Sequence, residues 1–496
     1  MNSFASVETH IRAAIRLGRE FDSVMAAHMF WLYPTQIALF ASLMALYYLV
    51  PRVRIQNAVL LFLGLDVAWY MSPMYCAVLG CSAALDWLLA SSIRKSNSEA
   101  RKDVFLWTSI VSNMGLLLLM LSPGIQSSLL GAMRASSLPG WISHGVEKFL
   151  LDGFHVFLVF SKMTLVLDVR KGKWKSEFPL LDGMVFGMFF TRYAGTPIDR
   201  ARDTLPQLAR PRLWSNVRLE EGMWLLLVGV VEISFHHELD AFLGLLLDGV
   251  PRGVALFPAS WVFMLDAWLA FSGLVDLARA FATFAGIHLP ENFDAPLAST
   301  NIADFWRRWN VSVMAWLNEE IFSKVAYRFR SLELGGTILA CLATFVFCGL
   351  AHEISWASTL WWSIQAALMV GYFVAKKRVK KLGKSLGNPR WFAFLCWALT
   401  FGTVAYTFII EEVHSDWGPL DLLRASLGRP FWPDSLTASN CARVLVISAA
   451  AIFLHAVNRG KGFGDWARRL APHWRSILAC LLVFAALAAH WEIPLT

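Results

Sequence analysis

Long apolar segments recur along the whole chain, and they constrain its fold more than any other feature of the sequence. Runs of about 16 or more apolar residues alternate with short polar stretches. Of the 496 residues, 57% are hydrophobic, which excludes an ordinary soluble globular protein. The alternating segments of about ten residues that mark a membrane β-barrel are not evident. The sequence therefore predicts an all-α, polytopic integral membrane protein.

The lengths of the apolar runs predict about 11 to 13 transmembrane helices. The predicted spans are 33–50, 57–72, 75–92, 104–122, 148–168, 221–247, 254–286, 336–352, 356–375, 392–410, 441–457 and 476–492. Two further segments, 179–191 and 303–322, are too polar or too short to cross a bilayer. We predict that they form re-entrant or in-plane helices that line a protein-walled cavity. Residues 1–24 are predicted to form an amphipathic helix on the membrane surface, and 25–496 a single membrane domain.

Basic residues predict the orientation of the chain in the membrane, because cytoplasmic loops are enriched in Lys and Arg. The basic loops are 94–102, 170–175, 200–218, 324–330, 376–390 and 459–475. Placing all of them in the cytoplasm agrees with the order of the spans, and it leaves both termini periplasmic or extracellular. These loops explain the net charge of +8 better than nucleic acid binding does, so membrane lipids are the expected surroundings and nucleic acid is no expected partner.

Polar side chains are concentrated in one block between Asn301 and Trp356. An Asp or Arg in a membrane costs roughly 2.5–3.5 kcal/mol unless it faces a cavity or a partner. The block contains tryptophans, charged residues and Asn310, and His352 lies at the end of a later apolar run. Because such groups are usually functional, Asn310 and His352 are the candidate catalytic residues. Asn310 reaches the depth of His352 only if 303–322 is re-entrant.

Each candidate also has a structural interpretation. His352 is suited to act as a general base near neutral pH, although a histidine at a helix end can simply bond a carbonyl. Asn310 cannot titrate, so it would steady an oxyanion or position a substrate, unless it is a cap. Arg307 and Arg308 either extend to the membrane edge or bind the phosphates of a coenzyme or phosphopantetheine donor.

The other candidate binding residues are Asp304 and the two tryptophans that flank the arginine pair, Trp306 and Trp309. The tryptophans are more typical of a cavity wall or an interface belt than of specific contacts. Asp266, Ser272 and Asp276 share one face of a predicted helix, which favours a buried hydrogen-bond network. No metal is predicted, because neighbouring side chains of one helix converge poorly on an ion and His352 lacks the second histidine of a zinc-protease motif. The polar groups that raised the metal alternative are His236, His237, Glu238 and Asp240.

Three stretches in the second half of the chain resemble membrane-bound O-acyltransferases. They read FSGLVDLARAFATFAG, LPENFDAPLASTNIADFWRRWNVSVMAWLNEEIF and CGLAHEISW. The resemblance is specific over 271–356, and it is closest to the bacterial branch that acetylates alginate or transfers D-alanine to teichoic acid. It identifies His352 with the invariant histidine of the family and Asn310 with its second site. The polysaccharide branch usually has His at that second site, whereas Asn is common in members that acylate lipids, sterols or peptides.

The resemblance implies helices around a central membrane-spanning tunnel and an O-acyltransferase in the bacterial inner membrane. A small acyl group such as acetyl would move from a cytoplasmic thioester, either acyl-CoA or an acyl carrier protein, to a hydroxyl of a cell-envelope polysaccharide. No bound cofactor is expected, and a carrier protein or an extracytoplasmic protein would be a partner. Asn310 leaves a lipid, peptide or small-molecule acceptor as the alternative. A proton-coupled transporter or flippase is a second alternative, disfavoured because the two halves show no repeat.

Overall fold

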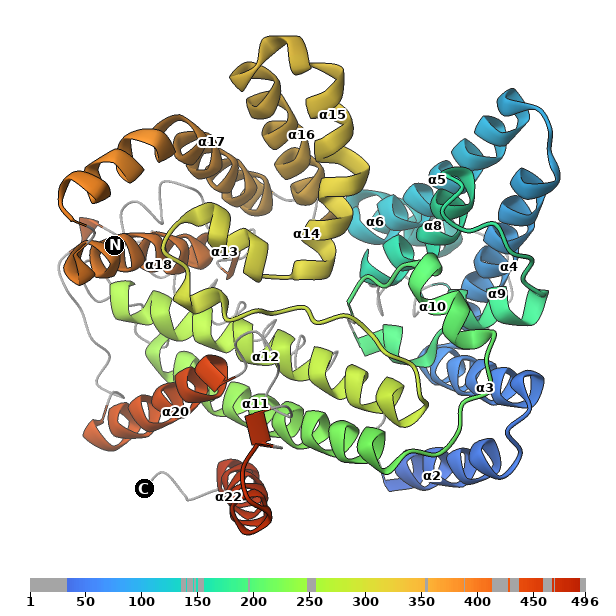
Figure 1. Ribbon diagram of the computed structural model, residues 1–496, viewed down its shortest axis with the longest axis horizontal. Coiled ribbons are helices and arrows are strands. Elements are labelled where there is room, and N and C mark those ends of the chain that lie inside the picture. Colours follow the sequence, from blue (N-terminus) through green and yellow to red (C-terminus); the bar gives the residue numbers. More distant parts are fainter. Residues whose placement is uncertain are drawn as a thin grey trace. The chain divides into compact units, whose positions relative to one another are not determined.

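Helices account for nearly all of the regular structure in this computed structural model, as the apolar runs predict. The structure describes residues 34–134, 140, 146, 149, 156–194, 197–247, 256–352, 356–387, 389–412, 427–428, 437–457, 466–467 and 469–490. The predicted surface helix at 1–24 lies outside these residues. Contacts divide the chain into two compact units, drawn in Figure 1. The prediction of a single domain over 25–496 stays a prediction beside this division.

The amino-terminal unit comprises Ser23–Met223 and Leu277–Pro290. Its centre is the helix α4, which packs against α3, α5, α8 and α9. Serines set two of the helix starts: Ser72 Oγ accepts a hydrogen bond from Tyr75 N (2.9 Å) at the start of α4, and Ser98 caps α5. Its helices are α2 (Pro34–Leu49), α3 (Val53–Met71), α4 (Pro73–Lys95), α5 (Glu99–Leu121), α6 (Pro123–Arg134), α8 (Val156–Arg170), α9 (Leu180–Gly187), η2 (Phe190–Ala194) and α10 (Ala201–Leu208).

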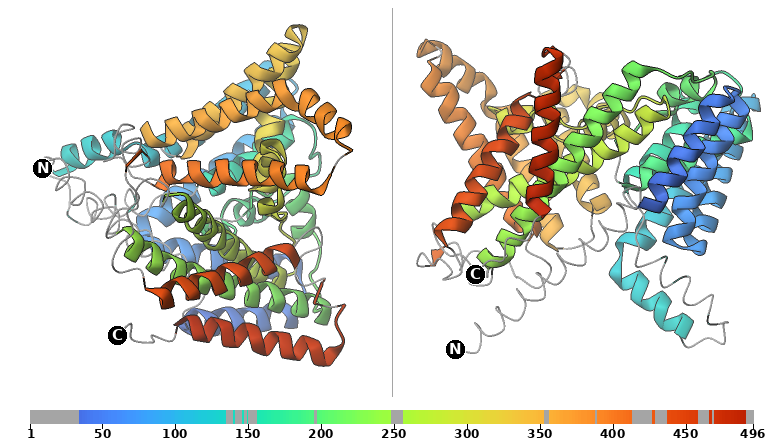
Figure 2. Two further views of the ribbon diagram at one scale, coloured as in Figure 1. Left: turned by 90° about the vertical axis from the view of Figure 1, so that its left-hand side faces the viewer. Right: turned by 90° about the horizontal axis from the view of Figure 1, so that it is seen from below.

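The carboxy-terminal unit comprises Trp224–Asp276 and the residues from Glu291 onward, and two further views are given in Figure 2. Its tightest helix pair is α16 and α17, and α16 also packs against α15. The helices α11 (Asn216–Leu247) and α12 (Leu256–Phe284) contribute residues to both units. The others are α13 (Ile302–Arg308), α14 (Val311–Leu317), η5 (Asn318–Phe322), α15 (Ser323–Arg328), α16 (Leu334–His352), α17 (Trp356–Ser385), α18 (Arg390–Glu412), α20 (Ala438–Val457) and α22 (Pro472–His490).

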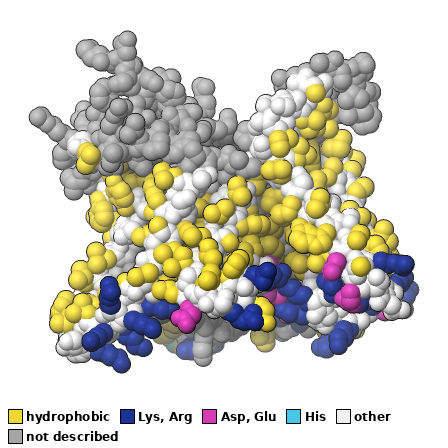
Figure 3. Space-filling view, turned by 90° about the horizontal axis from the view of Figure 1, so that it is seen from above, with side chains coloured by type: hydrophobic (Ala, Val, Ile, Leu, Met, Phe, Trp, Pro, Cys, Tyr) yellow, Lys and Arg dark blue, Asp and Glu magenta, His cyan; other side chains and the backbone are white. Residues whose placement is uncertain are grey.

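The helices follow the predicted spans closely. Within the described residues, six of them (α4, α5, α12, α16, α18 and α20) are long and apolar enough to cross a membrane. Large hydrophobic side chains face outward, among them Trp107 (60% exposed) and Val346 (58% exposed), and Figure 3 shows many such side chains on one face. The predicted loop 376–390 differs, because α17 stays helical as far as Ser385. Lys and Arg are good helix formers, so solvated basic residues extend the helix.

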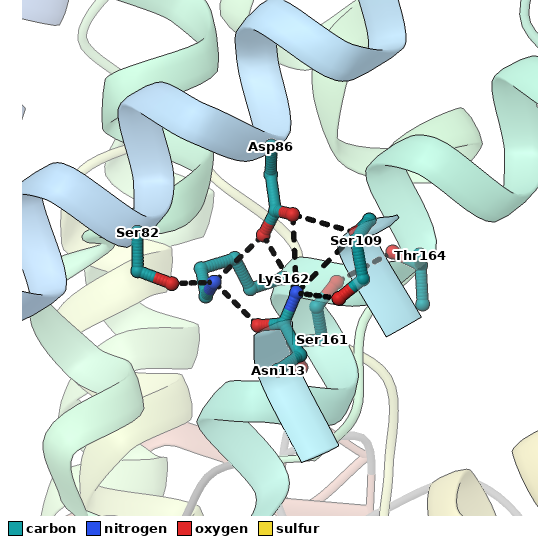
Figure 4. Close-up of polar contacts among 7 residues, drawn as sticks. All are labelled: Ser82, Asp86, Ser109, Asn113, Ser161, Lys162 and Thr164. Carbon is teal, nitrogen blue, oxygen red and sulfur yellow. Dashed lines mark hydrogen bonds and ion pairs between the residues drawn. The ribbon is translucent and has the colours of Figure 1, made fainter. Parts of the chain in front are cut away.

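A buried lysine joins three helices of the amino-terminal unit (Figure 4). Lys162 of α8 is 0% exposed, and its ammonium lies 2.6 Å from the carboxylate of Asp86 on α4. It also donates to Ser82 Oγ (2.6 Å) and to Asn113 Oδ1 on α5 (2.5 Å). Ser109 Oγ and Asn113 Nδ2 donate to Asp86 in turn. All three ammonium donors are therefore bonded, which is what allows a charge to stay in apolar surroundings.

Replacing Lys162 should destabilise the protein strongly. The substitution Lys162→Met leaves the Asp86 carboxylate buried without its cation, which typically costs about 3–5 kcal/mol of unfolding free energy. The measurement is denaturant unfolding in detergent micelles. The matched control is Lys102→Met, because Lys102 pairs with the exposed Glu99 and such pairs contribute little. Equal small changes in the two variants would contradict a structural role for the buried pair.

Candidate active site

A sharp turn at Trp309 and Asn310, called the elbow below, interrupts the segment 303–322, which we predict to form a re-entrant or in-plane helix. The helix α13 begins at a cap, where Asn301 Oδ1 accepts a hydrogen bond from Asp304 N (2.9 Å), and it ends at Arg308. Asn310 then adopts the left-handed conformation, with φ 50° and ψ 52°, and α14 begins at Val311. The segment is therefore a chain of short helices, α13, α14 and η5, rather than one continuous helix.

An extended segment at 292–294 supports this elbow from the side. Phe293 and Trp309 form an antiparallel bridge, and Asp294 N donates to Arg308 O at 3.0 Å. The side chain of Asn292 accepts two hydrogen bonds from Ser312, from its backbone N at 3.1 Å and from its Oγ at 2.7 Å. Sequence periodicity gives no signal for these contacts, because segments of two or three residues are too short to show any.

The two arginines that precede the elbow differ in the exposure of their side chains. The Arg308 guanidinium is 14% exposed and lies 3.0 Å from the Asp304 carboxylate, and it donates to Asp294 O at 3.1 Å. Arg307 also pairs with Asp304, yet its side chain is 73% exposed. Burial raises the pKa of the Asp304 carboxyl, but the bonds from Arg307 and Arg308 outweigh burial, so its pKa lies below the ordinary value. Arg308 is thus held by the fold, and Arg307 remains accessible to a ligand.

Aromatic side chains connect the elbow to α16 and α17. The Trp306 ring stacks on Trp362 at 5.5 Å and contacts Phe345 of α16 at 5.6 Å and Trp361 at 5.8 Å. Trp306 is 3% exposed and Trp361 2% exposed, and their indole Nε1 atoms have no hydrogen-bond partner among the described residues. An indole N–H usually finds a partner when it is buried. This aromatic cluster therefore fits a cavity wall as well as a packed core.

His352 is the last residue of α16. Phe345, the α16 residue that touches Trp306, lies seven positions earlier in the sequence. At about 1.5 Å per residue, His352 is about 10 Å further along the helix axis. The elbow thus packs against the same helix that ends in His352, while the predicted pairing of Asn310 with His352 stays a prediction.

Other polar groups have structural partners. His236 Nδ1 lies 2.7 Å from Asp266 Oδ1, which joins α11 to α12, and Arg443 pairs with Glu238 at 2.7 Å. His455 of α20 accepts a hydrogen bond at Nε2 from the backbone N of Leu297 (2.9 Å). That partner lies 158 positions away in the sequence, so sequence analysis names none. Among the described residues, no group of three or more His, Cys, Asp or Glu is arranged to hold a metal ion.

Because Asn310 has a left-handed backbone, the protein should be more stable with Gly than with Ala at this position. This order is the reverse of the usual one within a helix. Asn310→Ala should be about 1 kcal/mol less stable than Asn310→Gly, because a Cβ is strained in this conformation and Gly is not. The control is Ala315→Gly in α14, an exposed right-handed position, where Gly should lower stability by about 0.5–1 kcal/mol. Denaturant unfolding measures all three variants. A more stable Ala at position 310 would contradict the left-handed conformation.

Comparison with known proteins places the elbow and His352 in one family domain. Residues 222–408 match the model of MBOAT, the membrane-bound O-acyltransferase family. The chain is 25% identical to the teichoic acid D-alanyltransferase of Bacillus subtilis over 310 residues, which cover 56% of this chain and 76% of the relative. It is 26% identical to the probable alginate O-acetylase AlgI of Pseudomonas syringae over 370 residues, covering 66% of this chain and 65% of the relative.

A third relative, the peptidoglycan O-acetyltransferase of Helicobacter pylori, is 22% identical over 261 residues, which cover 50% of this chain and 47% of the relative. The chain thus spans about half to three quarters of the length of these relatives. The resemblance seen in the sequence is confirmed, including the bacterial branch. The match to the model of the membrane-bound O-acyltransferase family covers residues 222–408, which contain Asn310 and His352.

Proposed function

We propose that this protein is a membrane O-acyltransferase that moves a small acyl group from a cytoplasmic thioester to a hydroxyl of a cell-envelope glycan. One observation carries the proposal: the family match at 222–408 contains both Asn310 and His352. The relatives, named for acyl transfer to teichoic acid, alginate and peptidoglycan, support a polymer of the cell envelope as the acceptor. Acetyl is the simplest acyl group consistent with two of those three names.

The reaction requires a base for the acceptor hydroxyl. His352 accepts the hydroxyl proton while the hydroxyl oxygen attacks the thioester carbonyl carbon. The resulting tetrahedral intermediate collapses, the carbon–sulfur bond breaks, and the departing thiolate takes the proton back from His352. The ester and the free thiol are the products.

Asn310 serves the same reaction without titrating. Its carboxamide orients the acceptor or donates a hydrogen bond to the oxyanion. The aromatic cluster of Trp306, Phe345, Trp361 and Trp362 excludes water, which would otherwise hydrolyse the thioester. Asp304 and Arg308 hold the elbow, and Arg307, which is exposed, suits the phosphate of acyl-CoA or of a phosphopantetheine arm. Trp309 packs beneath the elbow against Phe293 and Phe408.

The proposed location is the bacterial inner membrane, with the thioester delivered from the cytoplasm. The exposed basic end of α17, Lys376–Lys384, supports a cytoplasmic position for that end of the helix. In this orientation both termini are periplasmic. The donor is acyl-CoA or an acyl carrier protein, and an extracytoplasmic protein would take over the modified acceptor. Asn310, which is typical of the branches that acylate lipids and peptides, supports a lipid, peptide or small-molecule acceptor as the second candidate.

Loss of the base should abolish transfer. His352→Ala removes the group that accepts the hydroxyl proton, and loss of a general base lowers turnover about 10²- to 10⁴-fold. The measurement is free-thiol release from acetyl-CoA, or from an acetylated carrier protein, by purified protein in detergent with cell-envelope extract as acceptor. The control is His288→Ala, because His288 is an exposed histidine of the amino-terminal unit. Unchanged turnover in His352→Ala would exclude the proposed base, and consumption of thioester by the wild type separates the enzyme from a transporter or flippase.

The residue at position 310 should influence the acceptor. Asn310→His introduces the residue that the polysaccharide branch usually has, and His also tolerates a left-handed backbone. We expect this variant to retain thioester turnover and to shift the ratio of glycan to lipid products. Mass spectrometry of the acylated products from a mixed envelope extract measures that ratio. An identical product ratio in the wild type and the variant would mean that position 310 does not select the acceptor.

A further inference from the structure

Asn310 holds the N-cap position of α14, yet its side chain makes no capping hydrogen bond. An N-cap side chain normally accepts a hydrogen bond from one of the first backbone amides of its helix, and it does so from an extended backbone. The left-handed backbone of Asn310, with φ 50° and ψ 52°, does not have that geometry. The amides at the start of α14 therefore need acceptors from elsewhere in the chain.

Asn292 supplies those acceptors. Its backbone O accepts from Val311 N at 2.8 Å, and its Oδ1 accepts from Ser312 N at 3.1 Å. Ser312 Oγ donates to the same Oδ1 at 2.7 Å. Asn292 is 1% exposed, so water does not compete for these bonds. A residue from another segment of the carboxy-terminal unit thus performs the capping that Asn310 would normally perform.

We infer that Asn292 is a positioning residue, which caps α14 in place of Asn310 and so leaves the Asn310 carboxamide available to the acceptor. This inference rests on the proposed function. Asn310 Oδ1 is buried and has no hydrogen-bond partner among the described residues. An amide oxygen accepts hydrogen bonds, so this group suits the hydroxyl that is acylated.

The decisive experiment compares variants of Asn292 in two backgrounds, with thioester turnover as the readout. In the wild-type background, Asn292→Ala should lower turnover about 10- to 100-fold, because a displacement of about 1 Å in a positioned group has effects of that order. Asn292→Asp keeps the side-chain acceptor and should recover most of the activity. In the Asn310→Gly background, Asn292→Ala should change turnover by less than about 2-fold, since no carboxamide is left to position.

A matched control and a second readout complete the test. Ser312→Ala removes the hydroxyl bond to Asn292 and keeps the backbone bond, so its turnover should stay near wild type. Hydrogen exchange of the Ser312 amide, whose acceptor is Asn292 Oδ1, should be faster in Asn292→Ala than in Asn292→Asp. The Val311 amide donates to the backbone O of Asn292 and should exchange alike in both variants. An equal fold-loss from Asn292→Ala in both backgrounds would overturn the positioning role, and unchanged exchange would overturn the capping. A wild type without thioester turnover would instead overturn the proposed function, and the exchange measurement would still decide the capping.

Discussion

Polar groups in apolar surroundings need partners within the protein, and this requirement governs both units. Lys162 satisfies this requirement fully, because its ammonium donates hydrogen bonds to Asp86, Ser82 and Asn113. His455 meets it through the backbone of Leu297. Such pairs hold helices in one arrangement and leave nothing for a substrate. Lys162 and His455 are therefore structural in this arrangement, even though each, taken alone, is a functional candidate.

The elbow at Asn310 departs from that requirement. The backbone and side-chain carbonyl oxygens of Asn292 accept hydrogen bonds from α14. Asn310 Oδ1 and the indole nitrogens of Trp306 and Trp361 are buried without hydrogen-bond partners among the described residues. A buried unpaired polar group typically costs about 1–3 kcal/mol. A backbone such as that of Asn310 adds strain of similar size, which is common where a site is held ready for a substrate. An acyl acceptor or donor that enters this region would satisfy groups that the fold leaves open.

The sequence predicts the helices well, because bilayer thickness and apolar length are directly related, and Ser and Asn mark where helices such as α13 begin. It does not predict the elbow. No proline or glycine marks a break within 303–322, and only the backbone angle of Asn310 reveals it. The roles of Asn292 and His455 depend on contacts across 20 and 158 positions, which no local pattern contains. Arg307 and Arg308 are adjacent in the sequence, and only the structure separates the exposed Arg307 from the partly buried Arg308.

The conformation of the elbow also bears on the choice between Asn and His at position 310. Few side chains other than Gly adopt a left-handed backbone readily, and Asn, Asp and His are the ones that are enriched there. The resemblance to the family gives His at this position in the polysaccharide branch and Asn in branches that acylate lipids or peptides. Both residues tolerate this backbone, so a His in place of Asn310 would not require rebuilding the turn. Because the capping of α14 comes from Asn292, that exchange leaves the start of the helix intact. The residue at position 310 can therefore change without disturbing the start of α14.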